Sequence, residues 1–324
     1  MTCTFHADRE TLLGCSRCGR SACPECLRDA PVGQHCLACV EGLPADEPLD
    51  AAAVRRLTTK QRKQQQASSG SRRPGWVFHA IVVVFVGLCA ATQPFMWEIV
   101  AGEPIGRAVA IGVVVLGVVL SVTLHEYAHA VTAYWGGDRS VVAKGYLTLD
   151  FRRYAHPLLS IGLPVLFLAM GGLPLPGGAV LVEEHRLRSR AWSSLVSLTG
   201  GLMNVAFVFV LALLVSSEAL WGGNWPLRSI LAYLLVIEVA LIVLNYLPIP
   251  GLDGYGVIEP FLPRALAEPL EALRPWGFFI LVGLMFTGSL GFIWDIGFDV
   301  AEMLGVDPSM AWLGGEMASL PDGS

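Results

Sequence analysis

The hydrophobic residues of the chain are concentrated after residue 75, where they form long runs separated by short polar stretches. A helix rises 1.5 Å per residue, so about 20 apolar residues are needed to cross a bilayer. Five runs come close to that length or exceed it: Trp76 to Gln93, Ile105 to Trp135, Trp192 to Val215, Ser229 to Leu247 and Trp276 to Trp294. The pattern predicts an all-α polytopic membrane protein.

A sixth apolar run, Pro157 to Gly172, is shorter and breaks into "GGLPLPGG". If it spans, there are six transmembrane helices; if it is re-entrant, there are five. In the five-span arrangement 20 of the 22 Lys and Arg residues fall on one side, leaving only Arg107 and Arg228 opposite. Cytoplasmic loops are enriched in these residues, so we favour five spans with a re-entrant segment.

Overall composition agrees with a membrane protein, since 54% of the 324 residues are hydrophobic and only 15% are charged. These proportions exclude an ordinary soluble domain. The opening "MTCTFHADRE" has no apolar core of the kind found in a signal peptide. We therefore expect a cell-membrane protein whose N-terminus stays in the cytosol.

The composition divides the chain into four parts. Residues 1–40 are rich in cysteine, and 41–75 are polar, with the stretch "KQRKQQQASSGSRRPG" predicted to form a flexible linker. Residues 76–294 carry the apolar runs. The tail at 295–324 has six acidic and no basic residues, which places it outside under the same charge rule.

The N-terminal part contains four ligand pairs, each with two residues between its members. They are Cys3 and His6, Cys15 and Cys18, Cys23 and Cys26, and Cys36 and Cys39. Such spacing in a reducing compartment predicts two structural zinc sites rather than disulfides. The order resembles a B-box-like cross-brace, in which the first and third pairs share one ion. Sequential pairing is the alternative, and His35 could replace Cys36.

The second apolar run ends in "HEYAH", which fits H-E-x-x-H. On a helix this spacing puts His125 and His129 one turn apart on one face, where they can bind one zinc ion, with Glu126 beside them as a general base. The alternative is a pair of buried histidines that only join neighbouring helices. Ionisable residues inside a span favour a functional site.

A catalytic zinc site needs three protein ligands and one open position, and the residues after His129 offer no third ligand. The best candidate lies in "NYLPIPGLDGYG", where Pro248 and Pro250 end a helix before Asp253. Taken alone, this stretch is more typical of a turn. In the five-span topology it ends on the same side as HEYAH, which favours Asp253 as a ligand.

Together these residues resemble the site-2 protease family of intramembrane zinc metalloproteases. The resemblance rests on H-E-x-x-H and on N-x-x-P-x-P-x-L-D-G, matched here from Asn245 to Gly254. A third family feature, Gly-Pro-x-x-Asn, appears as "GGLMN", with Asn204 kept and Gly201 where proline is usual. The resemblance covers about residues 76–275.

The resemblance implies hydrolysis of peptide bonds in or near a substrate's transmembrane segment, with one catalytic zinc held by His125, His129 and Asp253. Asn204 and Asn245 are then candidates for binding substrate backbone, or else polar contacts between helices. "KGYLTLDF", Lys144 to Phe151, alternates like an edge strand that an extended substrate could join, or a surface hairpin.

We expect a membrane-protein substrate, the lipid bilayer and an unidentified protein as partners. The N-terminal part has four arginines against four acidic residues, which does not favour nucleic acid. The rival functions are a zinc transporter and an inactive scaffold. A transporter needs ionisable residues along a whole path, and the spans offer chiefly His79 and Glu238 besides the proposed site. An inactive scaffold is disfavoured because Glu126 is present.

Overall fold

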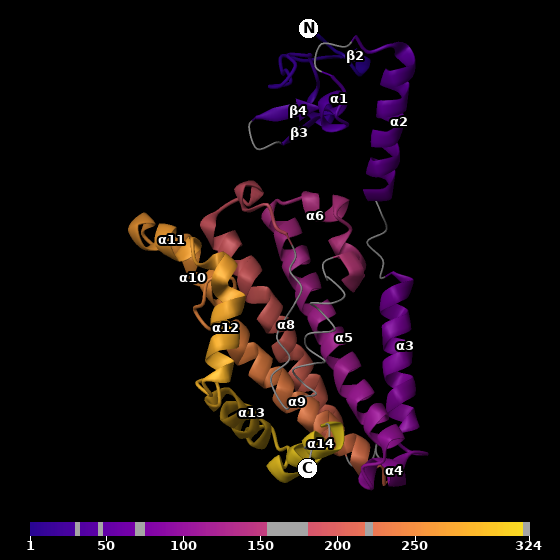
Figure 1. Ribbon diagram of the computed structural model, residues 1–324, viewed down its shortest axis with the longest axis vertical. Coiled ribbons are helices and arrows are strands. Elements are labelled where there is room, and N and C mark those ends of the chain that lie inside the picture. The colour runs from indigo at the N-terminus through magenta and orange to yellow at the C-terminus, as the bar shows by residue number, and fades with distance from the viewer. Residues whose placement is uncertain (30–32, 45–47, 69–74, 154–180, 218–222, 320–324) are drawn as a thin grey trace. The chain divides into compact units, whose positions relative to one another are not determined.

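The computed structural model describes residues 1–29, 33–44, 48–68, 75–153, 181–217 and 223–319 of the chain (Figure 1). The chain divides into two compact units, Met1–Gly70 and Ser71–Ser324. The boundary falls in the polar segment that the composition places between the cysteine-rich part and the apolar runs.

Two short antiparallel hairpins build the first unit. Strand β1 (Thr2–Cys3) pairs with β2 (His6–Glu10), and β3 (Leu27–Asp29) pairs with β4 (Gln34–Cys36), which leads into the short helix α1 (Leu37–Val40). The described core combines six buried cysteines with a small set of apolar residues, Phe5, Ala22, Leu27, Leu37, Ala38 and Leu57. So small an apolar core supplies little stability by itself, and units of this size ordinarily need metal ions or disulfides.

A long helix, α2 (Ala51–Ser68), occupies most of the segment predicted to be a flexible linker, so that prediction is wrong for residues 51–68. Its Ala, Gln, Lys and Arg residues have high helix propensity. Leu57 is buried in the core of the first unit, Gln61 donates to the carbonyl of Glu25, and Lys60 lies 2.5 Å from Glu41. These contacts attach α2 to the cysteine-rich hairpins.

The second unit is helical throughout its described part, with no β-strand. Its helices are α3 (Trp76–Ala91), α4 (Met96–Val100), α5 (Pro104–Gly136), α6 (Ser140–Ala143), α8 (Arg190–Ser216), α9 (Trp225–Asn245), α10 (Asp253–Ile258), α11 (Arg264–Glu271), α12 (Gly277–Phe286), α13 (Phe292–Met303) and α14 (Pro308–Ala318). The predicted all-α membrane fold is confirmed, although the number of spans is approximate.

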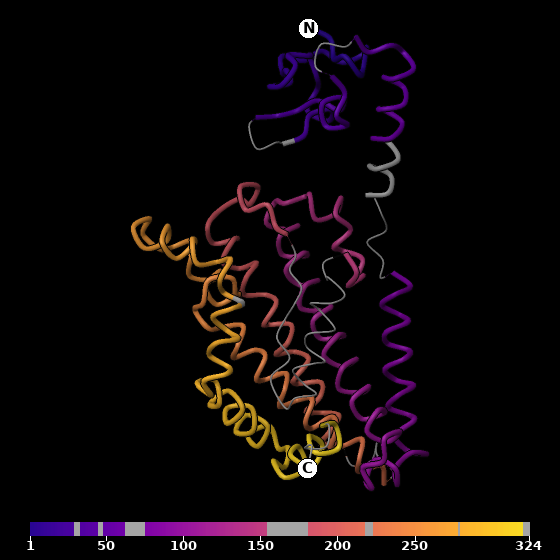
Figure 2. Tube along the Cα trace, viewed as in Figure 1, coloured from indigo at the N-terminus to yellow at the C-terminus, as the bar shows by residue number. Residues whose placement is uncertain are grey.

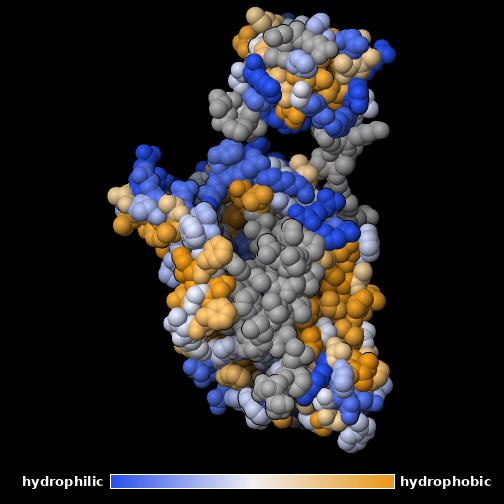
Figure 3. All heavy atoms as spheres, in the orientation of Figure 1, coloured by the Kyte–Doolittle hydropathy of each residue, from blue (hydrophilic) through white to orange (hydrophobic). Residues whose placement is uncertain are grey.

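Three of the described helices, α5, α8 and α9, are long and apolar enough to cross a membrane. Helix α9 is the most buried of them, and α5, α8, α13 and α14 pack against it (Figure 1). Helix α3 is shorter and exposes Val83, Val84 and Val86, and Figure 3 shows this apolar surface along α3. An exposed apolar stripe on such a helix is suited to contact with lipid.

The end of α5 and the start of α8 lie at the same end of the bundle. The backbone N–H of Arg188 donates to the carbonyl of Gly136 over 2.9 Å, just after α5 ends and just before α8 begins. The five-span topology requires this arrangement. The run from Pro157 to Gly172, on which the prediction of a re-entrant segment rested, lies outside the described residues.

The last predicted span, Trp276 to Trp294, is not one helix. It divides into the two helices α12 and α13. The chain changes direction between them, where Gly288 has a φ of 70° (Figure 2). The residues predicted as an acidic tail continue α13 and form α14. Gly314 allows α14 to pack closely on α9, because a Cβ there would lie 2.0 Å from the carbonyl oxygen of Ser229.

The predicted strand from Lys144 to Phe151 is also wrong. The segment contains a 3₁₀ turn, Tyr146–Thr148, followed by Leu149 with a φ of 53°. Tyr146 and Leu147 are both buried in a small cluster beside α5, so consecutive side chains point inward where a strand would alternate them. This segment offers no strand edge to an extended substrate.

The attachment of α2 makes a prediction about the first unit. Leu57→Ala should release α2 from the cysteine-rich hairpins, because replacing a buried leucine by alanine costs about 2–5 kcal/mol. We expect faster amide exchange along α2 and unchanged zinc content. Thr59→Ala, at an exposed position of the same helix, is the matched control. Equal exchange in the two variants would contradict the packing of α2.

Candidate functional site

Two histidines of α5 meet inside the second unit. His125 and His129 are four residues apart on one helix and are 6% and 7% exposed. Their Nε2 atoms lie 2.9 Å apart, and the rings stand edge to face with centroids separated by 4.6 Å. The helical spacing predicted from "HEYAH" therefore places both Nε2 atoms at one point.

Asp253 reaches the same point from a separate part of the chain. Helix α9 ends at Asn245, the chain turns through Gly251 with a φ of 103°, and α10 begins at Asp253. The Asp253 carboxylate places Oδ2 3.0 Å from His125 Nε2 and Oδ1 3.4 Å from His129 Nε2. The structure thus brings together the three predicted catalytic ligands.

The spacing of the two histidine nitrogens and the Asp253 carboxylate oxygens fits a zinc ion. Ligand bonds of about 2.0–2.1 Å at tetrahedral angles put nitrogen and oxygen ligands about 3.3 Å from one another. The observed separations of 2.9–3.4 Å lie close to that value. Two nitrogens and one carboxylate oxygen are also the usual ligand types of a catalytic site with one open position.

Hydrogen bonds on the far sides of the rings leave both Nε2 atoms as acceptors. His129 Nδ1 lies 2.6 Å from the carbonyl of Val196, which can only accept, so Nδ1 carries the proton. His125 Nδ1 lies 2.5 Å from Asn204 Oδ1 in the same way. Two ring nitrogens with lone pairs therefore face a carboxylate, and a cation satisfies all three.

Helix α8 passes the histidines at very close range. At Gly200 a Cβ would lie 2.4 Å from His129 Nε2 and 2.7 Å from His125 Cε1, so only glycine fits. Gly254 has a similar role, since a Cβ there would lie 2.2 Å from the carbonyl oxygen of Tyr246. These two glycines allow α8 and the turn before α10 to close around the ligands.

The remaining predicted residues of this site differ in their surroundings. Glu126 is 5% exposed, directly follows His125 and lies close enough to His129 for an electrostatic interaction. Asn204 is buried, and its side-chain amide is occupied by hydrogen bonds to His125, Ser121 and Glu238. Asn245 is half-buried at the end of α9. The side chain of Asn204 is therefore engaged within the bundle, and its predicted contact with substrate stays a prediction.

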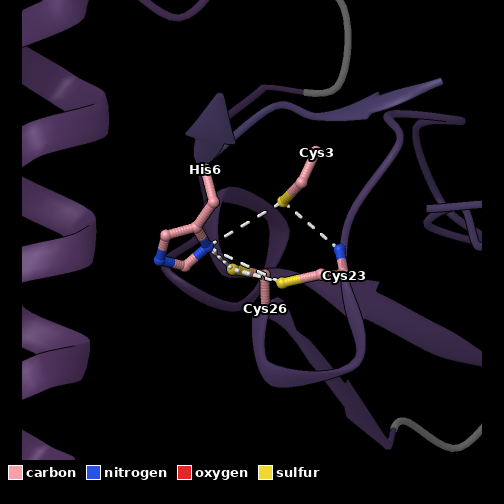
Figure 4. A group of neighbouring side chains, drawn as sticks. All are labelled: Cys3, His6, Cys23 and Cys26. Carbon is pink, nitrogen blue, oxygen red and sulfur yellow. Dashed lines mark hydrogen bonds between the residues drawn. The ribbon is translucent and has the colours of Figure 1, made fainter. Parts of the chain in front are cut away.

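The eight ligands of the first unit form two groups. Cys3, His6, Cys23 and Cys26 make one group, with His6 Nδ1 3.6 Å from Cys23 Sγ and 3.2 Å from Cys26 Sγ (Figure 4). The first and third pairs therefore lie together, as in a cross-brace. Sequential pairing does not match this geometry.

The other group consists of Cys15, Cys18, Cys36 and Cys39. The Sγ atoms of Cys15 and Cys39 are 3.8 Å apart, and those of Cys18 and Cys36 are 3.6 Å apart. Zinc–sulfur bonds of 2.3 Å at tetrahedral angles require about 3.8 Å. All these cysteines are free thiols, and His35 lies outside the group.

The ligand thiols of the first unit have pKa values shifted in both directions. Burial opposes ionisation of Cys3 and Cys15, but hydrogen bonds from backbone N–H groups outweigh it and lower the pKa of both thiols. Burial raises the pKa of Cys26, and the adjacent Cys23 and Cys3 raise it further. Burial likewise raises the pKa of Cys39, with the neighbouring Cys18 and Cys15 adding to the effect. Several thiolates in so small a space repel one another unless a metal ion neutralises them.

Sequence analysis missed Gly200 and Ser121, and it named Glu238 without its hydrogen bond to Asn204. Gly200 precedes the motif residue Gly201 within "TGG", but nothing local shows that two imidazoles press against it. Ser121 lies one helical turn before His125 and is 1% exposed. A polar residue on the same face as the motif was the available signal.

Comparison with known proteins gives relatives over most of the chain. The chain is 37% identical over 252 residues to the protein named "Putative zinc metalloprotease Rip2" of Mycolicibacterium smegmatis, which covers 76% of this chain and 94% of the relative. The protein of the same name from Mycobacterium tuberculosis H37Rv is 36% identical over 256 residues, with the same coverage. "Putative zinc metalloprotease YwhC" of Bacillus subtilis is 29% identical over 182 residues, covering 53% of this chain and 80% of the relative.

No protein-family model and no solved structure matches the chain. The relatives are named as zinc metalloproteases, and the ligand groups described above fit zinc both in the bundle and in the first unit. The chain therefore belongs to the site-2 protease family of zinc metalloproteases and carries an N-terminal zinc module.

Proposed function

We propose that this chain is an intramembrane zinc endopeptidase that hydrolyses peptide bonds in or next to transmembrane segments of membrane-protein substrates. One observation carries the proposal: the group formed by His125, His129 and Asp253 lies between helices that are long and apolar enough to cross a membrane. His125 is ten residues before Trp135, which places it about 15 Å from the end of the helix. Substrate and water must reach it within the bilayer.

The chemistry follows from the residues that surround the ligand group. His125 Nε2, His129 Nε2 and the Asp253 carboxylate would hold the ion. When bound, zinc supplies a Lewis acid that polarises the scissile carbonyl and lowers the pKa of water toward neutrality. Glu126 takes a proton from the attacking water onto its carboxylate and passes it to the nitrogen of the leaving amine. The buried surroundings strengthen these electrostatic effects.

Asn245 is our proposed contact to the substrate, because it stands at the end of α9 just before the turn that presents Asp253. For the orientation, we propose that the N-terminal module and the open side of the catalytic site face the cytosol. The distribution of Lys and Arg supports this, with 20 of 22 on that side in the five-span topology. We also propose that the zinc module either binds a protein or regulates access to the membrane site.

The first test concerns the proton transfer. Glu126→Gln should lower the rate of cleavage by roughly 10²–10⁴-fold, the usual contribution of a general base, while zinc content stays at the wild-type level. Both proteins are reconstituted in vesicles with single-span substrates, and the cleavage products are quantified. Equal cleavage by the two proteins would rule out this assignment.

The second test counts metal ions. We expect three zinc ions per wild-type chain, two in the N-terminal module and one in the bundle, because the ligand atoms form three groups. A triple His125→Ala, His129→Ala, Asp253→Ala variant should retain two, and Cys89→Ser, outside all three groups, should retain three. Elemental analysis of purified protein checks these counts. Unchanged zinc in the triple variant would contradict the catalytic site.

The third test probes the close approach of α8. Gly200→Ala should remove the catalytic zinc and the activity, because the added methyl group overlaps both imidazoles. The control is Gly87→Ala in α3, where a Cβ meets no atom within 4 Å. Zinc content and cleavage are measured on both variants. An active, fully metallated Gly200→Ala variant would show that α8 lies farther from the histidines.

A further inference from the structure

Glu238 is a fully buried acid in α9 that the proposed mechanism does not use. A carboxyl group inside an apolar bundle is costly unless hydrogen bonds compensate for the loss of water. Its position among the large apolar side chains of α9 therefore calls for a specific role. Its hydrogen bonds lead toward the catalytic ligands.

One oxygen of Glu238 accepts two hydrogen bonds. Ser121 Oγ donates to Glu238 Oε2 over 2.5 Å, and Asn204 Nδ2 donates to the same oxygen over 3.1 Å. Asn204 Nδ2 also donates to Ser121 Oγ over 2.7 Å. The other oxygen, Oε1, has no hydrogen-bond partner among the described residues. The three side chains come from α5, α8 and α9 and join these helices at one polar point.

This arrangement fixes the orientation of the Asn204 amide. An amide can be turned either way unless its partners distinguish the nitrogen from the oxygen. Glu238 Oε2 acts as an acceptor toward Asn204, so the NH₂ group must face it. Asn204 Oδ1 then points the opposite way, where it lies 2.5 Å from His125 Nδ1.

The orientation of the amide in turn fixes the protonation of the His125 ring. Facing a carbonyl oxygen, Nδ1 must carry the hydrogen, and the lone pair stays on Nε2 toward Asp253 and His129. A reversed amide would present NH₂ to Nδ1 and favour the tautomer in which Nε2 carries the hydrogen. That tautomer cannot bind a metal through Nε2.

We propose that Glu238 is a positioning residue for the catalytic metal. Through Ser121 and Asn204 it holds the His125 ring in the tautomer that binds zinc. This inference rests on the proposed function, because it assigns a role in metal binding at the same site.

The test measures zinc affinity directly, as the zinc bound per chain after equilibration at a series of free zinc concentrations, and measures activity over the same series. The two structural sites of the first unit, whose ligands are unchanged, serve as the internal reference for bound zinc. Full-length protein in vesicles is assayed for substrate cleavage over a range of free zinc concentrations set by a chelator buffer. Glu238→Leu should raise the zinc concentration for half-maximal binding at the catalytic site, and for half-maximal activity, by about 10–100-fold, as expected for loss of a partner that orients a ligand. Activity should return at saturating zinc.

Two control variants accompany Glu238→Leu. Glu238→Gln can keep an acceptor oxygen at the position of Oε2 and place its NH₂ where the unpartnered Oε1 lies, so its zinc dependence should stay close to wild type. Leu235→Met changes another fully buried position of α9 outside the network and should leave the curve unchanged. If Glu238→Leu shares the half-saturating zinc of these controls, the proposal is wrong.

A double-variant comparison tests whether Glu238 acts through Asn204. Asn204→Leu and the combined Asn204→Leu, Glu238→Leu variant should need the same free zinc concentration for half-maximal activity. Without Asn204, Glu238 has no hydrogen-bonded connection to His125 that its own replacement could remove. A further rise in the combined variant would overturn the inference. If Glu238→Leu alone does not fold, Asn204→Leu and the combined variant still test the inference. The combined variant replaces both partners of the hydrogen bond with apolar groups, so it leaves no buried polar group unpaired there.

Failure of the proposed function has a different result. If wild-type protein shows no zinc-dependent cleavage, the protease assignment itself fails. If wild-type cleavage depends on zinc and the Glu238 variants do not shift that dependence, only the present inference fails.

Discussion

The bundle depends on one constraint: hydrogen-bond acceptors of His125, His129 and Asp253 meet at one point in its buried interior. Two imidazole nitrogens and a carboxylate lie within 3.4 Å of one another between α5 and α10. Without a cation their lone pairs would repel one another, and burial would increase the cost. The close approach of α8 at Gly200 and the break after α9 both serve to bring these atoms to one point.

The Nδ1 atoms on the far sides of the two rings are also buried and also need hydrogen-bond partners. Each ring nitrogen that faces away from the site has an acceptor, the Val196 carbonyl for His129 and the Asn204 amide for His125. Glu238 and Ser121 then satisfy the amide group of Asn204. Residues from α5, α8 and α9 thus form one connected network, so the chemistry of the site and the packing of the three longest helices depend on each other.

In the first unit, too, groups of metal-ligand side chains from separate parts of the chain meet and hold the fold together. Its hairpins bury few large apolar side chains, and the two groups of thiolate and imidazole ligands take the place of a conventional core. The first group joins the β1–β2 hairpin to the turn before β3, and the second joins the loop at Cys15 and Cys18 to the end of β4 and to α1. Helix α2 adds the apolar contact of Leu57 and polar contacts at Lys60 and Gln61. The residues of that segment have high helix propensity, but its low content of apolar residues favoured the prediction of a linker, and the contacts with the hairpins could not be seen in the sequence.

Short-range patterns in the sequence determined the ligand types, the helical spacing of His125 and His129, the apolar helices and the paired cysteines. Each depends on neighbouring residues, on composition or on one period of a helix. Tertiary structure decided what depends on distant residues: that Glu238 reaches Asn204, that only glycine fits at position 200, and that α13 and α14 pack on α9. It also decided that Lys144 to Phe151 is not a strand, because Tyr146 and Leu147 are both buried beside α5. Alternation in a sequence cannot reveal such a contact, since the partner surface lies elsewhere in the chain.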